Sequence, residues 1–521
     1  MHAKDIRKVV LGNRLTLGEV VAVARFKADV EFSAVYQVKV DKSRRLLEKQ
    51  IEQGEIMYGV NTGFGALYTQ IISPEETAQL QRNILLSHAA SVGEPLPKEV
   101  VRAIMLMVLQ NLGQGYSGVR LETLEMYRQF LNLNLTPFSP KEGSVGYLSP
   151  EAHIALVLIG EGQAYFGGEL MSAKKALHLA GIEPINLSAK EGLALTSGTT
   201  SPTGMGALAL YDMLKAAETA DIIGAMSLEV LKGTVRAFDE RLISVRPHKE
   251  QQETASNIRK ILSDSHMAKA FENYRLQDPL SLRAIPQLHG AAKKTLNDAH
   301  TTIEIEMNGC SDNPILWPDS EEGGTISGCN CDSSYVGIEL DSACIAAAAL
   351  AKMSERRNSR LINEKHSELP NFLIKNAGLN SGLMIPQYSQ AGLLNDMKIL
   401  SHPATADSIP TCADQEDYVA MGYNAAKKAR EVASKLEYVL AIELLSIYTA
   451  HQLTDNYPSP GSASQAVLDK LACFIPKMEE DQYLYPFLEG IRDLIHSGEM
   501  IQCVEDKLGK IFNKEFINGN L

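Results

Sequence analysis

The chain has 521 residues, of which 45% are hydrophobic, so it can bury a large core in roughly two or three folding units. Its net charge of −13 argues against nucleic acid and anionic membranes as partners. Seven cysteines at irregular spacings do not form a disulfide framework, and the lone Cys329-Asn330-Cys331 lacks the further ligands of a zinc site. We therefore expect reduced thiols, no metal and a cytoplasmic protein.

Along the chain, helical patterns dominate. Residues 1–13 are charged and lack the apolar core of a signal peptide. Ser73-Pro74-Glu75-Glu76 predicts a helix start, with a cap, a proline and acids in the first turn, and this helix continues to Ser91. Helical spacing predicts four further segments at Glu99–Leu112, Pro202–Leu231, Ser334–Arg360 and Asp417–Leu453. Strand patterns are short, as at Gly323–Ser327.

Glycine and proline mark the loops between these helices. They predict loops at Tyr58–Gly65, Thr136–Pro150, Ser197–Gly204, Asp278–Pro286, Asn308–Pro318 and His402–Pro410. Long helices joined by such loops predict a mainly α fold with a long central helical bundle. We expect an N-terminal domain over 1–205 that carries the Tyr58 loop and the Gly143–Pro150 loop, the central bundle over 206–455, and a C-terminal helical region over 456–521.

The Gly-rich loop Tyr58–Gly65 lacks the Lys-Ser/Thr of a phosphate-binding P-loop. It resembles instead the catalytic tyrosine loop of the aromatic amino acid ammonia-lyases, which act on histidine or phenylalanine. About ten further blocks match that family in the same order, among them Ser87-His88-Ala89-Ala90, Gly143-Ser144-Val145-Gly146, Gln277-Asp278-Pro279, Ser311-Asp312-Asn313-Pro314 and Gln415-Glu416-Asp417. The resemblance implies the long bundle of the ammonia-lyase and fumarase/aspartase type. It also implies a homotetramer whose active sites combine loops from several subunits.

One departure from the family concerns its electrophile. After Gly-Ser-Val-Gly the family has Ala-Ser-Gly, which cyclises into a methylidene-imidazolone that captures the substrate amine. Here Gly146 is followed directly by Tyr147 and Leu148. Either the cyclised group, as a non-standard residue, is left out of the written sequence, or the deletion is real. Ser197, Leu280, Cys331 and Asp332 also replace family residues around the same pocket, which favours a real deletion and no cofactor.

Other family positions are kept. By resemblance, Tyr58 matches the base that removes the β-proton, Arg283 the residue that pairs with the substrate carboxylate, and Glu416 and His88 the residues associated with histidine as substrate. Gln277 and Asn313 match further pocket residues of the family, whereas Tyr147, Ser197 and Asp332 replace pocket residues.

A quaternary trimethylammonium group has no lone pair to add to an electrophile, and it leaves as neutral trimethylamine. We therefore expect an ergothionase-like carbon–nitrogen lyase that eliminates trimethylamine from ergothioneine and gives thiourocanate. Arg283 binds the carboxylate, Glu416 the ring N–H, and Tyr58 takes the proton. Tyr147 faces the cation, and Asp332 adds negative charge.

Two alternatives stay open. The first is a methylidene-imidazolone-dependent histidine ammonia-lyase, which converts histidine to urocanate and ammonia and whose cyclised tripeptide is left out of the written sequence. The second is an inactive relative that binds an imidazole compound. The retained Tyr58, Arg283 and Glu416 argue against this second alternative, because an inactive protein needs no base.

Overall fold

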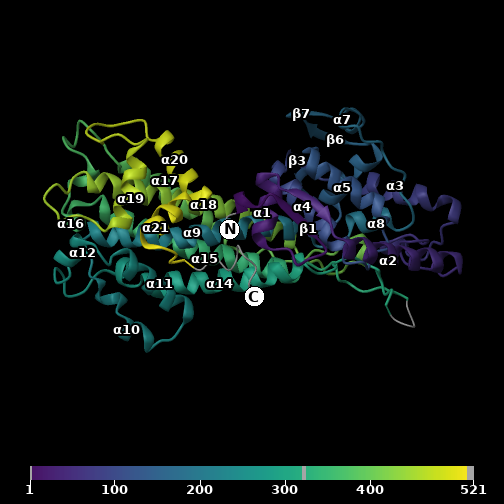
Figure 1. Cartoon of the computed structure of the whole chain (residues 1–521), viewed down its shortest axis with the longest axis horizontal. Helices are drawn as coiled ribbons and strands as arrows, with labels where there is room; N and C mark the ends of the chain where they lie inside the picture. The colour runs from purple at the N-terminus through teal and green to yellow at the C-terminus, as the bar shows by residue number, and fades with distance from the viewer. Residues whose placement is uncertain (1–2, 320–323, 513–521) are drawn as a thin grey trace.

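The computed structural model describes residues 3–319 and 324–512 of the chain. The described part is mostly helical, which confirms the mainly α prediction, and its strands form only small sheets. In Figure 1 the molecule is elongated, with α3 and α8 near one end and α12 and α16 near the other.

Five long helices make up the central bundle. They are α9 (Thr200–Val230), α14 (Ile285–Met307), α15 (Ser334–Leu361), α17 (Met384–Leu400) and α18 (Gly422–His451). Every residue of α9 is buried, so this helix is surrounded by protein on all sides. Helices α14, α15 and α18 pack around it, and α17 packs on α15 and α18.

Shorter helices and small sheets form the N-terminal third. The helices are α1 (Leu17–Phe26), α2 (Ala34–Glu52), α3 (Thr77–His88), α4 (Lys98–Leu112), α5 (Leu121–Leu133), α6 (Ser149–Leu156), α7 (Ala173–Ala180) and α8 (Glu191–Thr196). The strands are β1 (Lys8–Leu11), β2 (Asp29–Phe32), β3 (Val92–Pro95), β4 (Thr136–Pro137), β5 (Pro140–Glu142), β6 (Gln163–Phe166) and β7 (Glu169–Ser172). β1 pairs with β2 in parallel, and the other pairs here are antiparallel.

The remaining helices flank the bundle, whereas the last hairpin lies against α2. They are α10 (Glu240–Ser244), α11 (Lys249–Ile261), α12 (His266–Ala270), α13 (Leu280–Arg283), α16 (Glu364–Ser367), α19 (Ser462–Ala472), α20 (Tyr485–Ser497) and α21 (Glu499–Leu508), with the hairpin of β8 (Ile315–Leu316) and β9 (Thr325–Ile326).

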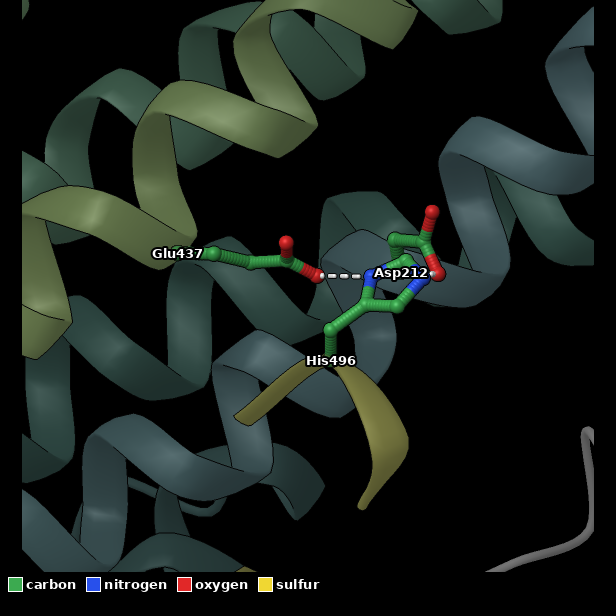
Figure 2. A group of neighbouring side chains, drawn as sticks. All are labelled: Asp212, Glu437 and His496. Carbon is green, nitrogen blue, oxygen red and sulfur yellow. Dashed lines mark hydrogen bonds and ion pairs between the residues drawn. The ribbon is translucent and has the colours of Figure 1, made fainter. Parts of the chain in front are cut away.

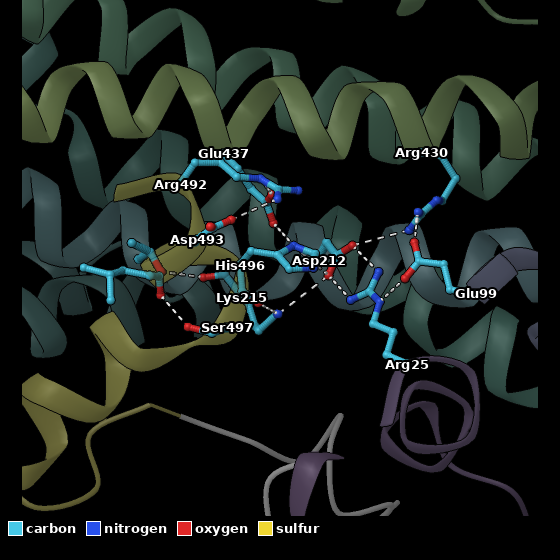
Figure 3. Close-up of polar contacts among 12 residues, drawn as sticks. Arg25, Glu99, Asp212, Lys215, Arg430, Glu437, Arg492, Asp493, His496 and Ser497 are labelled. Carbon is cyan, nitrogen blue, oxygen red and sulfur yellow. Dashed lines mark hydrogen bonds and ion pairs between the residues drawn. The ribbon is translucent and has the colours of Figure 1, made fainter. Parts of the chain in front are cut away.

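A buried network of charges joins the N-terminal third to the bundle and to α20 (Figure 3). Arg25 of α1 donates to both carboxylate oxygens of Asp212 in α9, each at 2.7 Å, and to Glu99 of α4 at 2.6 Å. His496 Nδ1 of α20 lies 2.8 Å from Glu437 Oε1 of α18. Because each partner comes from a different helix, the network fixes how these helices meet.

Asp212, Glu437 and His496 are close enough together to suggest a metal site, with their ligand atoms within 4.8 Å of one another (Figure 2). However, Arg25 already forms a two-pronged ion pair with Asp212, and Arg492 Nε lies 2.9 Å from Glu437. These cations occupy the carboxylates that a metal ion would need, so the group is better described as an ion-pair network.

Several predicted boundaries are wrong. The helix predicted to continue to Ser91 ends at His88, and the loop predicted over 136–150 contains β4, β5 and the start of α6. Helix α18 begins at Gly422 rather than Asp417, because Met421 has a left-handed backbone with a φ of 53°. Helix α9 begins at Thr200, so the loop predicted over 197–204 is shorter. The loop predicted over 278–286 contains the short helix α13 and the start of α14.

The other predicted helices agree more closely with the structure. Helices α4 and α15 lie within a residue of the predicted bounds, and the helix predicted to start after Ser73 begins with a 3-10 turn over Pro74–Glu76. The predicted strand over 323–327 corresponds to β9, although residue 323 lies outside the described residues. No helix in the described part of the chain is long and apolar enough to cross a membrane. The domain boundaries near residues 205 and 455 stay predictions.

Candidate active site

The Tyr58 loop is held in a tight conformation against α8. Gly59 has a φ of +65°, which favours glycine, and a Cβ added there would lie 2.2 Å from Leu193 Cδ2, so the Leu193 side chain would have to move. Asn61 Oδ1 accepts from the backbone N–H of Met57 at 2.8 Å, which closes the turn. The backbone N–H of Gly65 donates to the Tyr58 hydroxyl at 2.9 Å. The phenol oxygen is thereby fixed at the edge of the loop.

Tyr147 and Glu416 come together from distant parts of the chain. The Tyr147 hydroxyl donates to Glu416 Oε2 at 3.0 Å, and the Thr411 hydroxyl donates to the same oxygen at 3.1 Å. The next residue, Leu148, donates its backbone N–H to the Thr196 carbonyl at the end of α8. Because both bonds use Oε2, Glu416 Oε1 takes part in neither of them.

His88 ends α3 beside the same loop. Its ring lies 5.2 Å from the ring of Phe64, and its Nδ1 lies 2.8 Å from the Ile84 carbonyl oxygen. A carbonyl oxygen can only accept, so Nδ1 carries the proton and Nε2 is the free acceptor. Burial lowers the pKa of His88, although the charge of Glu416 works in the opposite direction. The histidine is therefore mainly neutral near pH 7.

The two tyrosines resist ionisation. Burial raises the pKa of the Tyr58 phenol; the hydrogen bond from Gly65 lowers it, and the charge of Glu416 raises it again. Burial and Glu416 also raise the pKa of Tyr147 well above its usual value. Both effects follow from low polarity and a nearby negative charge, which disfavour a phenolate.

Three of the predicted pocket residues lie on segments next to this cluster. Asn313 Oδ1 accepts from the backbone N–H of Gly328 at 2.9 Å and so holds the two arms of the β8–β9 hairpin together. Asp332 Oδ1 accepts from the backbone N–H of Ser334 at 2.9 Å, just before α15. Ser197 is buried directly after α8.

The structure does not bring Arg283 and Gln277 to this cluster. With its amide oriented so that Oε1 faces the guanidinium, Gln277 accepts from Arg283 Nη1 at 3.2 Å and Nη2 at 3.3 Å. Arg283 Nε also donates to the Asp278 carbonyl, and Asp278 in turn accepts from the Thr234 backbone at 2.6 Å. Thr234 follows the far end of α9, a helix of 31 residues that begins beside Tyr147.

At 1.5 Å per residue, α9 separates the two groups by about 45 Å within one chain. The sequence placed Tyr58, Glu416 and Arg283 in one site. Within a single chain, only the first two are neighbours.

Sequence reasoning missed three thiols at the edge of this cluster. Cys329 and Cys331 precede α15, and the Cys412 Sγ lies 3.3 Å from the Ala66 backbone nitrogen beside the Tyr58 loop. The charges of Cys331 and Cys412 act on the pKa of Tyr58. A signal existed at Cys331, which replaces a family pocket residue, but the nearness of Cys412 depends on the fold.

The comparisons with known proteins place the chain in a family. The family model described as "Aromatic amino acid lyase" matches residues 15–472. A protein of Caldanaerobacter subterraneus named "Histidine ammonia-lyase" is 41% identical over 96% of this chain and 99% of its own length. The crystal structure of histidine ammonia-lyase from Trypanosoma cruzi has a TM-score of 0.91 at 34% identity, covering 98% of this chain and 96% of that one. Ergothionase from Treponema denticola has a TM-score of 0.88 at 27% identity, covering 95% and 99%.

These comparisons contradict the predicted elimination of trimethylamine from ergothioneine. The chain is more similar to relatives named histidine ammonia-lyase, at 41% identity over nearly its whole length, than to ergothionase at 27%. The missing tripeptide and the replaced pocket residues Ser197, Leu280, Cys331 and Asp332 predict the wrong specificity, because they are few beside the whole-chain identity to relatives named histidine ammonia-lyase.

The prediction of no cofactor is not supported either, because the family normally makes a methylidene-imidazolone electrophile from its own chain. The residues present here do not fit that group. Gly146 is bonded directly to Tyr147, so no Ala-Ser-Gly is available to cyclise. A Cβ at Gly146 would lie 2.6 Å from Ser333 Oγ, and Leu148 has a φ of 77°. The shortened loop is thus packed tightly against the start of α15.

Both the sequence motifs and the whole-chain fold agree on the wider relationship. The family model covers most of the chain, and the relative at 41% identity spans nearly all of it. The described fold is that of the solved lyases. This chain belongs to the aromatic amino acid lyase family and is an enzyme of the lyase class.

Proposed function

We propose that this chain is a carbon–nitrogen lyase that acts on histidine, releasing ammonia and leaving urocanate. The observation that carries the proposal is its 41% identity to a histidine ammonia-lyase along nearly the whole chain. The arrangement of Tyr58, His88 and Glu416 in one cluster supports the same substrate, since it offers a base and two partners for an imidazole ring.

In this proposal, Glu416 and His88 select the imidazole ring. Glu416 Oε2 is occupied by Tyr147 and Thr411, so Oε1 is the oxygen that accepts the ring N–H of the substrate. The neutral His88, with its proton on Nδ1, presents Nε2 as a further acceptor. The hydroxyl of Tyr147 acts through Glu416, because its hydrogen bond fixes the orientation of the carboxylate.

Tyr58 is the proposed base for the β-proton of the substrate. The N–H of Gly65 points at the phenol oxygen and stabilises the phenolate, whereas burial and Glu416 oppose ionisation. Positive charge that arrives with the substrate ammonium and with an arginine shifts this balance toward the phenolate. Base catalysis then depends on the substrate being bound.

Arg283 is the proposed partner of the substrate carboxylate, and we propose that a second copy of the chain supplies it. Its planar fork suits a two-pronged pair with a carboxylate, and Gln277 orients it. Within one chain it lies near the opposite end of α9 from Tyr147, and this helix is about 45 Å long. Helices α15 and α17 also leave large apolar side chains exposed, namely Tyr335, Ile338, Ile345, Ile385, Tyr388 and Ile399. Such a face suits a homotetramer with shared active sites.

Ser197, Asn313 and Asp332 are the proposed lining of the amine side of the pocket, with Asp332 as the negative partner of the substrate ammonium. Their positions next to the Tyr147 loop and at the start of α15 support this assignment. We derive no step through an electrophile, because only Tyr147 stands between Gly146 and Leu148 and it cannot form one.

The test is to incubate purified full-length protein with histidine and to measure ammonia together with the ultraviolet absorbance of urocanate. Both products in equal amounts are expected, and a Tyr58→Phe preparation serves as the control for contaminating activity. Turnover of phenylalanine or tyrosine in place of histidine would overturn the substrate assignment.

Intact mass, measured on the same sample, decides how the Tyr147 loop is built. A chain heavier than the printed sequence by one alanine, one serine and one glycine residue, less two waters, carries the family's cyclised group. A mass equal to the printed sequence means that histidine turnover proceeds without it.

A further inference from the structure

Two thiols face each other at the edge of the candidate site. The Sγ atoms of Cys329 and Cys331 lie 3.9 Å apart in the turn that precedes α15. Cys329 is exposed and Cys331 is half-buried, so one thiol is open to solvent while the other lies behind it. The backbone N–H of Asp332 donates to the Cys329 carbonyl at 3.1 Å and closes the turn around the pair.

The pair lies within electrostatic range of both site tyrosines. A charge on Cys331 raises the pKa of Tyr58, and charges on Cys331 and Cys329 raise that of Tyr147. The adjoining Asp332 is one of the proposed pocket residues. A change in this turn therefore alters the surroundings of the proposed base and of the loop that holds Glu416.

The two thiols differ in reactivity. A hydrogen bond from the Cys331 thiol lowers the pKa of Cys329 to about 7, while the same contact and burial raise the pKa of Cys331. The thiolate is the nucleophilic form of cysteine, so Cys329 is the attacking group and Cys331 is the neighbour that resolves the product.

We propose that Cys329 and Cys331 form a redox-active dithiol that is converted to a disulfide by a low-molecular-weight disulfide and that regulates the activity of the candidate site. The Cys329 thiolate attacks one sulfur of the reagent, forms a mixed disulfide and expels one thiolate. Cys331 then loses its proton, attacks the Cys329 sulfur and expels the second thiolate. Two cysteine thiols are oxidised, and one disulfide reagent is reduced to two thiols.

The geometry of the turn permits this bond. Residues two apart in a turn bring their Cα atoms into the range of disulfides, about 4.4–6.8 Å. Closing the Sγ separation from 3.9 Å to a bond length needs side-chain rotation and a small adjustment of the turn. Cys412, beside the Tyr58 loop, is a further thiol of the candidate site, so the experiment must identify which thiols join.

The first experiment equilibrates the native full-length protein in buffers of reduced and oxidised glutathione at increasing oxidation. Free thiols are then trapped with N-ethylmaleimide, and the peptides are identified by mass spectrometry. We expect a peptide that carries both Cys329 and Cys331, lacks the label and has lost two hydrogens. The exposed Cys473, directly after α19, remains labelled under the same conditions. Labelling of both Cys329 and Cys331 throughout, or a disulfide to Cys412, would overturn the pairing.

Variants separate the chemistry from its effect on the enzyme. Cys329→Ser and Cys331→Ser each abolish the intramolecular disulfide, whereas Cys473→Ser, the matched surface control, leaves it unchanged. The effect on catalysis rests on the proposed histidine lyase activity. Oxidised wild type should lose most of that activity and recover it with dithiothreitol, and Cys329→Ser should show neither change.

The two proposals fail in different ways. If the disulfide forms but histidine turnover is the same before and after oxidation, the regulation of activity is refuted. If no form of the protein turns over histidine, the proposed function fails, while the peptide mapping still decides whether the dithiol exists.

Discussion

At the scale of single residues, burial and the charge of Glu416 oppose the ionisation of the two phenols in the candidate site, Tyr58 and Tyr147. Glu416 receives hydrogen bonds from Tyr147 and Thr411 on one oxygen and raises the pKa of Tyr58 from a short distance. The same carboxylate thus has two effects in the proposed function. It binds the imidazole ring, and it holds the base in its neutral form until the substrate arrives.

Tyr58→Phe removes the proposed base while keeping the ring. We expect kcat for histidine to fall by about 10²–10⁴-fold, the usual contribution of general base catalysis. The exposed Tyr68→Phe nearby is the matched control and should turn over at the wild-type rate. Near-normal turnover by Tyr58→Phe would assign the proton transfer to another group.

Glu416→Gln changes the charge and keeps the shape. Because the charge of Glu416 raises the pKa of Tyr58, its removal lowers that pKa. The rising limb of kcat/KM against pH should therefore move to lower pH, while KM for histidine rises through the lost ring contact. The neighbouring exposed Asp417→Asn should leave both unchanged. If the rising limb of kcat/KM moved to higher pH instead, the assignment of Tyr58 as the base next to Glu416 would be contradicted.

At the scale of elements, loops and helices hold the site through close contacts that few residues permit. The Tyr58 loop lies against α8 at Gly59, and the Tyr147 loop lies against the start of α15 at Gly146. The buried charges of Figure 3 hold the supporting helices together, with Asp212 of α9 between Arg25 of α1 and His496 of α20.

Gly59→Ala tests the contact between the loop and α8. The added methyl group meets Leu193 and also forces a residue other than glycine into a positive φ. We expect lyase activity to fall sharply as the phenol is displaced. Gly167→Ala shares the positive φ, at +60°, but has nothing within 4 Å, so it should lose a little stability and no activity. Equal activity in the two variants would mean that the contact does not position Tyr58.

Asp212→Asn tests the charge network. Burial alone raises the pKa of Asp212, but Arg25 lowers it overall. Removing the charge leaves Arg25 and Lys215 without their main partner, so the free energy of unfolding should fall by about 3–5 kcal/mol. The depressed pKa means that this stability is present above the usual value of 3.8 and is lost as the pH falls through the folded pKa.

The measurement is urea denaturation near pH 7, repeated at lower pH, where the difference from wild type should shrink. Arg241→Ala, which breaks the surface pair of the exposed Arg241 with Asp239, is the control and should change little. A loss no larger than that of this control would show that the network is not stabilising.

At the scale of the whole molecule, the proposed site residues fall into two separate groups. Tyr58, His88 and Glu416 lie near one end of α9, and Arg283 lies near the other. Mixing inactive variants tests whether copies share a site. Co-expressed Tyr58→Phe and Arg283→Met chains should regain activity, because some mixed sites receive both intact residues.

Tyr58→Phe with Glu416→Gln is the control pair, since both residues come from one chain and no mixed site is whole. Light scattering on the same samples reports the assembly. Recovery in neither mixture would refute a shared site, and so would a protein that is active as a single chain.

Much of the fold follows from local pattern, but the site follows only in part. The helical spacing of Glu99–Leu112 predicts α4 closely. In contrast, the left-handed backbone conformation of Met421 shortens α18, and the hydrophobic periodicity does not predict it. Family motifs select Tyr58, Glu416 and Arg283. Their separation into two groups depends on the length and direction of α9. The order of the motifs along the sequence does not predict this separation. The contacts of Cys412 and of Tyr147 likewise depend on tertiary structure.

The complete burial of α9 limits which insertions and deletions this chain can accept during evolution. If copies share sites as proposed, the length of this helix sets the distance between the two groups of site residues in one chain. Each residue added or removed shifts one centre by about 1.5 Å and rotates it by about 100° relative to the other. Loops in this protein can therefore vary in length, as the shortened turn at Tyr147 does, while the central helix must keep its length.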